Sequence, residues 1–103
     1  MSRTRLPHRR FALTFDFEVN GLRYTATFGR FADGCVAEVF LSNHRSNSAA
    51  DVNARDAAIA ASFALQHGAA LEDLHQALSR DSYGRASGPL GAALDLISKM
   101  EPV

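Results

Sequence analysis

The chain has 103 residues, 47% of them apolar, and its 11 basic and 11 acidic residues give a formal net charge of zero. This length suits one compact domain with a single core. The apolar content excludes a chain that is disordered throughout. The zero net charge argues against a protein built around a nucleic-acid backbone.

The charge is unevenly distributed along the chain. The first ten residues, MSRTRLPHRR, carry four arginines and one histidine and no acidic residue. We expect residues 1–10 to be a basic, disordered arm, because chain termini are usually loose, and residues 11–103 to form one domain. The arm is also the segment that would contact phosphate groups if the chain bound nucleic acid.

No membrane span or secretory signal is expected. No apolar run approaches the roughly 18 residues that a span requires, and no apolar stretch follows the basic start. The single cysteine, Cys35, excludes an internal disulfide and fits a reducing cytoplasm.

The first predicted element is a hairpin. Residues 11–19, FALTFDFEV, alternate apolar and polar side chains, which predicts a half-buried strand. Asn20-Gly21 follows, and this dipeptide favours a two-residue turn. The register set by that turn pairs Val19 with Leu22, Phe17 with Tyr24, Phe15 with Ala26, and Leu13 with Phe28.

Asp33-Gly34 predicts a second turn, before a third strand over residues 36–41. A two-residue loop would place Phe28 opposite Val39, and Ala26 opposite Leu41, on the inner face. The outer face would then carry three apolar side chains that are a candidate contact for a protein partner or a second copy. These are Phe31, Val36 and Phe40.

The second half of the chain is predicted to be helical. Ser48 is a suitable N-cap for a helix that runs to about His67 and stops at Gly68. Residues 71–78 and 90–100 give two shorter helices. Strands followed by helices predict an α+β domain, a three-stranded antiparallel meander with the helices packed on one face (βββααα). The expected core is Phe15, Phe17, Phe28, Val39, Ile59, Phe63, Leu74 and Leu94.

The first helix has two apolar stripes. Val52, Ile59 and Phe63 form one, and the other consists mainly of alanines with Leu65. Apolar residues on two sides indicate a helix packed between other elements.

The stretch RASGPLGAAL, residues 85–94, reads as a helix start. Ser87 or Gly88 would be the N-cap, with Pro89 at the first helical position. A helix N-terminus can bind an anion through its free N–H groups, and two nearby arginines would add charge. The candidate anion site is Arg80, Arg85, Ser87, Gly88 and Leu90. The alternative is a helix cap with no further role.

No catalytic residue, metal or cofactor is expected. The four histidines and Cys35 match no zinc spacing. The glycines do not form a phosphate loop or a dinucleotide fingerprint. An enzyme that uses Asp56 with a histidine would need a complete constellation in a pocket.

The chain resembles the TSCPD family, which occurs at the C-terminal end of cobalamin-dependent ribonucleotide reductases and in short stand-alone proteins. The resemblance lies in residues 58–78, AIAASFALQHGAALEDLHQAL, in residues 80–94, and in residues 33–41, DGCVAEVFL. It covers about residues 13–98. Ala86-Ser87-Gly88-Pro89-Leu90 stands where the family has Thr-Ser-Cys-Pro-Asp, so the serine and proline are kept and the cysteine and aspartate are not.

The resemblance implies an accessory role connected with nucleotide reduction, without radical chemistry. The leading hypothesis is a stand-alone, non-catalytic domain that binds a protein partner or a small anion such as a nucleotide. The alternative is a nucleic-acid-binding module that uses the basic arm with Arg80 and Arg85. No membrane contact is expected.

Overall fold

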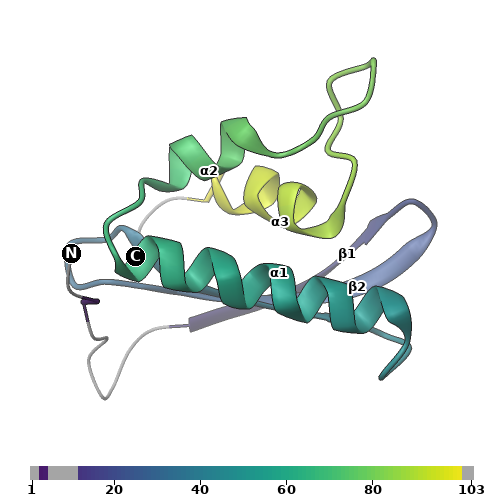
Figure 1. Ribbon diagram of the computed structural model, residues 1–103, viewed down its shortest axis with the longest axis horizontal. Helices are drawn as coiled ribbons and strands as arrows, with labels where there is room; N and C mark the ends of the chain where they lie inside the picture. The colour runs from purple at the N-terminus through teal and green to yellow at the C-terminus, as the bar shows by residue number, and fades with distance from the viewer. Residues whose placement is uncertain (1–2, 5–11, 101–103) are drawn as a thin grey trace.

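A computed structural model describes residues 3–4 and 12–100 of the chain. Three strands form one antiparallel sheet in the order β1-β2-β3, and three helices follow them on one face of the sheet (Figure 1). The predicted α+β arrangement is therefore confirmed. The elements are β1 (Ala12–Val19), β2 (Leu22–Arg30), β3 (Val36–Asn43), α1 (Ala49–Gln66), α2 (Leu71–Ala77) and α3 (Pro89–Ile97).

The β1–β2 hairpin has the register that the sequence predicts. Asn20 and Gly21 both have positive φ, 55° and 77°, as a two-residue turn of this kind requires. Phe17 lies opposite Tyr24, and their rings stack with centroids 5.6 Å apart. The turn fixes which residues pair, and the apolar alternation then determines which side chains of β1 face the core.

The β2–β3 register is also as predicted, although the loop is not. The Phe31 N–H donates to the Cys35 carbonyl, and Gly34 has φ 93°, so residues 32–34 form the loop instead of two residues. A shift between Gly29 and Arg30 then restores the expected pairing of Phe28 with Val39. The extra loop residue and the one-residue register shift thus compensate for each other. Between them, Val36 pairs with Arg30 and is only 5% exposed.

The buried core includes half of the residues that the sequence predicts for it. Phe17, Phe28, Val39 and Leu94 are buried, and Phe15 and Leu74 pack against them. Ile59 and Phe63, however, are 50% and 47% exposed, so their assignment to the core is wrong. The face of α1 that packs on the sheet consists of Ala54, Ala58, Ala61 and Leu65.

The alanine face is buried because α1 packs closely against the edge strand β3. Three buried polar side chains of α1 form hydrogen bonds with the backbone of β3. The Ser62 hydroxyl both donates to the Val39 carbonyl and accepts from the Val39 N–H, each at 2.9 Å. Gln66 donates to the Ala37 carbonyl, and Asp51 accepts from the Asn43 N–H. Small residues let the helix approach this closely, and the bonds protect an edge that could otherwise pair with another chain.

The predicted ends of α1 are confirmed. The Ser48 side chain accepts the Asp51 N–H, and Gly68 follows the helix with φ 103°. Within the described residues, no helix is long and apolar enough to cross a membrane.

The predicted arm over residues 1–10 lies mostly outside the described residues. Of the two that are described, Arg3 lies over the Phe63 ring, with its guanidinium carbon 4.4 Å from the centroid. The Thr4 N–H donates to the Gln66 carbonyl at 2.7 Å. These contacts cover the C-terminal end of the exposed stripe on α1.

Candidate functional site

The start of α3 is the candidate site, and the structure resolves which residue caps it. Gly88 is the N-cap and Pro89 is the first helical residue, with no hydrogen bond from a capping side chain. Ser87 does not cap the helix. Its backbone is held instead, since its N–H donates to the Ser79 carbonyl and its carbonyl accepts from the Asn20 side chain at 2.8 Å. The turn of the β1–β2 hairpin thus fixes where α3 begins.

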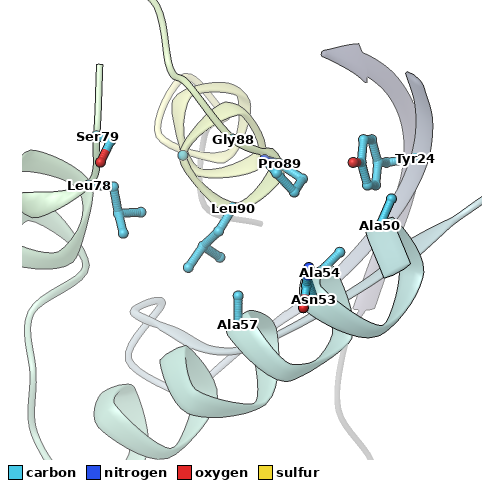
Figure 2. A pocket seen from close by; sticks show the side chains of 11 residues that line it. Tyr24, Ala50, Asn53, Ala54, Ala57, Leu78, Ser79, Gly88, Pro89 and Leu90 are labelled. Atoms are coloured by element: carbon cyan, nitrogen blue, oxygen red, sulfur yellow. The ribbon is translucent and has the colours of Figure 1, made fainter. Parts of the chain in front are cut away.

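A cleft of about 390 Å³ lies against this helix start (Figure 2). One wall is the small-residue side of α1, and the opposite wall is Leu78 with the first turn of α3. Tyr24 closes one end. The lining residues are Tyr24, Ala50, Asn53, Ala54, Ala57, Leu78, Ser79, Gly88, Pro89, Leu90 and Gly91. None of them carries a charge, so the cleft is apolar apart from a few hydrogen-bonding groups.

Of the residues predicted for an anion site, Gly88 and Leu90 line the cleft and the two arginines do not. Arg80 instead donates to both carboxylate oxygens of Asp95, at 2.7 and 3.2 Å, and to the Gly84 carbonyl. The His75 Nε2 contacts the same carboxylate. The hydrogen bond from Arg80 is the largest cause of a pKa for Asp95 lowered to about 2. This cluster joins the end of α2 to α3, so it has a structural role.

Arg85 is likewise engaged, in the loop that precedes α3. The Asp81 carboxylate accepts the Nε–H of Arg85 at 3.1 Å and the N–H groups of Tyr83 and Arg85 at 2.9 Å. These bonds lower the pKa of Asp81. Tyr83 stands at the tip of the loop, 81% exposed, with the Arg85 guanidinium 5.1 Å from its ring centroid. Both arginines are thus neutralised by a carboxylate, which removes much of the charge that the nucleic-acid hypothesis requires.

The three predicted partner contacts do not form one patch. Phe40 is on the outer face of the sheet and is 49% exposed. Val36 is in the core, so its predicted outer-face position is wrong. The reason is the shift beside Arg30, which turns Val36 to the inner face. Phe31 is half-buried and lines a separate hollow with Val36 and Cys35.

The outer face of the sheet holds the arrangement most similar to a catalytic triad. The Thr25 hydroxyl donates to the Asp16 carboxylate at 2.7 Å, and it lies 2.9 Å from His44 Nε2. A hydroxyl has one proton, so His44 can only donate to Thr25 and cannot act as its base. The hydrogen bond from Thr25 is the largest cause of the lowered pKa of Asp16. This cluster is a cross-strand polar ladder.

Other reactive groups are similarly isolated. Cys35 is exposed, and a hydrogen bond to the Asp33 side chain raises the pKa of its thiol, which disfavours the nucleophilic thiolate. Asp56 is exposed on α1. Among residues 3–4 and 12–100, no three His, Cys, Asp or Glu side chains are grouped so that they could hold a metal ion.

Comparison with known proteins identifies a relative of the chain. A vitamin B12-dependent ribonucleotide reductase from Agrobacterium fabrum is 34% identical to the chain over 77 residues. These residues are 75% of this chain and 6% of the reductase, so the chain spans only a small part of the relative's length. The chain is therefore related to a domain-sized part of such an enzyme. No family matches the chain, and no solved structure matches it.

Sequence reasoning missed Tyr24 as a residue of the site. The predicted register already placed it on the inner face, where every other paired side chain is apolar. Its hydroxyl, a polar group directed into a buried layer, was the available signal.

Proposed function

We propose that the chain is a non-catalytic accessory domain, related to the C-terminal TSCPD domain of cobalamin-dependent ribonucleotide reductases, that binds a small anion at the N-terminus of α3. The observation that carries the proposal is the cleft itself, which lies against the first turn of α3. Helix geometry leaves the first N–H groups without partners inside the helix, and the dipole there favours negative charge.

A non-catalytic role is supported by the residues that occupy the family signature. Gly88 and Leu90 stand where the family has cysteine and aspartate, so redox and acid–base groups are missing at these two positions. The carboxylates of the preceding loop and of α3 itself, Asp81 and Asp95, are held by arginines. A domain with this site can recognise a ligand and has little with which to transform it. The single cysteine is consistent with work in the cytoplasm, where thiols stay reduced.

Substitution at Gly88 tests the anion site. A side chain there meets open space, and its φ of −139° suits any residue. Gly88→Asp would place a carboxylate on the free N–H groups, where aspartate is a favoured N-cap. We expect this variant to remain folded and to lose binding of ADP or inorganic phosphate, measured by amide shifts at residues 88, 90 and 91 at constant ionic strength.

Gly88→Ala is the matched neutral control and should keep the binding. If the wild-type protein shows no saturable amide shift at residues 88, 90 and 91 with ADP, inorganic phosphate or benzoate, the anion site is wrong.

A protein contact is the second candidate function, and the position of Tyr83 favours it. Tyr83 is held at the loop tip by the backbone bonds to Asp81, and an exposed, rigid tyrosine beside an arginine is typical of interface hot spots. A ribonucleotide reductase chain is the proposed partner. Capture of that enzyme from native extract by wild-type protein, and not by Tyr83→Ala, would support this contact. Equal capture by both would exclude the loop.

A further inference from the structure

Tyr24 has an unusual position for a polar side chain. It lies in the middle of the sheet, is 4% exposed, and stacks on Phe17. Its hydroxyl forms no hydrogen bond with any of the described residues. Figure 2 shows the ring with its oxygen directed into the cleft, toward Pro89. The hydroxyl oxygen is reached from the cleft, since the only fully buried polar side-chain atom without a partner among the described residues is the Asn43 amide nitrogen. A ligand atom there would bond to the Tyr24 hydroxyl in place of solvent.

Tyr24 and the start of α3 both offer hydrogen-bond donors to the cleft. The first turn of α3 presents backbone N–H groups, and the phenolic hydroxyl of Tyr24 can donate its proton. An acceptor such as a carboxylate or phosphate oxygen would satisfy both.

The charge of the site favours a single negative charge. The lining has no lysine or arginine, and Arg80 and Arg85 are bound to their own carboxylates. A helix N-terminus is equivalent to about half a positive charge. It can therefore balance one carboxylate much better than the several charges of a polyphosphate.

The remaining surface of the cleft is mostly apolar, with Asn53 and Ser79 as its polar side chains. Ala50, Ala54 and Ala57 line one side, and Leu78 and Leu90 line the other. The volume of about 390 Å³ is near the lower end of the roughly 300–1,000 Å³ usual for small-molecule sites. A compact hydrocarbon or aromatic body would fill this space.

We propose that the cleft binds a small monocarboxylate with an apolar body. The carboxylate accepts hydrogen bonds from the Tyr24 hydroxyl and the N–H groups that begin α3, and the apolar body lies on the alanine wall of α1. This inference rests on the proposed anion site at α3 and adds to it the class of the ligand and the role of Tyr24.

Benzoate is a suitable probe, with benzyl alcohol as its neutral analogue and inorganic phosphate as an anion without an apolar body. Binding is measured by amide chemical shifts of the full chain at constant ionic strength. We expect saturable shifts for benzoate at Tyr24, Ala57 and residues 88, 90 and 91. Benzyl alcohol should bind about 10-fold more weakly, because it lacks the charge-assisted hydrogen bonds.

Two pairs of variants test the contacts. Tyr24→Phe keeps the ring and removes the hydroxyl, so it should weaken benzoate binding about 3- to 10-fold. Thr27→Val, which removes an exposed hydroxyl from the outer face of the same strand, should leave the benzoate affinity unchanged. Ala57→Leu fills the cleft and should abolish binding, whereas Ala60→Leu, on an exposed position of the same helix, should not. Thermal unfolding verifies that each variant is folded.

The outcomes separate this inference from the proposed function. If phosphate binds at residues 88–91 as tightly as benzoate, the anion site stands and the monocarboxylate is wrong. If neither anion shifts these residues, both proposals fail. Equal benzoate affinity of Tyr24→Phe and the wild-type protein would also overturn the inference.

Discussion

Substitutions at two neighbouring residues of α1, Ser62 and Phe63, test directly which face of this helix packs on the sheet. Ser62→Ala removes both hydrogen bonds to the backbone of Val39, each of 2.9 Å. Val39 is fully buried, so water does not replace them. Because an unsatisfied buried group costs about 1–3 kcal/mol, the loss should be about 2–6 kcal/mol for the two groups.

Phe63→Ala removes a much larger side chain and should cost less. Phe63 is 47% exposed, so the substitution removes about half of the roughly 1.5–3 kcal/mol expected for a fully buried phenylalanine. We therefore expect a loss near 1 kcal/mol, below the roughly 3–5 kcal/mol typical of a core position.

Urea unfolding at neutral pH measures both losses. Ser82→Ala, in the exposed loop before α3, is the control and should be close to neutral. Thermal unfolding should give the same order, since about 1 kcal/mol shifts the midpoint of a domain this size by about 4–8 °C. If Phe63→Ala destabilises the protein more than Ser62→Ala, α1 packs on the sheet through its other face and the edge-protection argument is wrong.

Two further predictions concern the region around α3. The pKa of Asp95, lowered to about 2, means that its ion pairs stabilise the protein above about pH 4 and are lost as the pH falls toward 2. Unfolding measured from pH 5 to 2.5 should therefore lose more stability in the wild-type protein than in Asp95→Asn, and Asp56→Asn, at an exposed carboxylate of α1, should not reproduce this difference. A Cβ at Gly91 would lie 3.1 Å from the Cβ of Ala86, so Gly91→Ala should be better tolerated in an Ala86→Gly background, with a coupling of about 0.5–1.5 kcal/mol. Additive effects in that cycle would show that the two positions do not meet.

The hairpin was predictable because its signals are local. A two-residue turn and strict alternation determine the β1–β2 pairing without reference to the rest of the chain. The packing face of α1 was not predictable in this way. The stripe with Ile59 and Phe63 has the larger apolar side chains, so the sequence favoured its burial. Close approach of α1 to β3 instead required the stripe of small alanine side chains. Ser62 decides between them through the backbone of Val39, and that contact spans 23 residues of sequence.

The sequence predicted where the site lies, at the start of α3, but not most of the residues that line it. The start of α3 could be read from Pro89 and the residues before it, but proximity in sequence did not indicate which groups face the cleft. Tyr24 reaches it from the sheet, while Arg80 is drawn away by Asp95, a residue 15 positions later on α3. The positive charge of Arg80 near the helix start is thus used in an ion pair that holds the loop in place.

The arginines still have a part in binding, because they fix the geometry of the helix start. Arg80 ties the base of the loop to α3 through Asp95 and bonds to the Gly84 carbonyl, and Asn20 holds the Ser87 carbonyl from the hairpin. These bonds come from three separate segments, so the first turn of α3 is positioned without a ligand. A ligand that binds there need not order the loop first, and this lowers the free-energy cost of binding. Arg80 and Arg85 therefore explain two properties of the cleft together. Their ion pairs hold the first turn of α3 in place, and for the same reason their positive charges do not line the cleft.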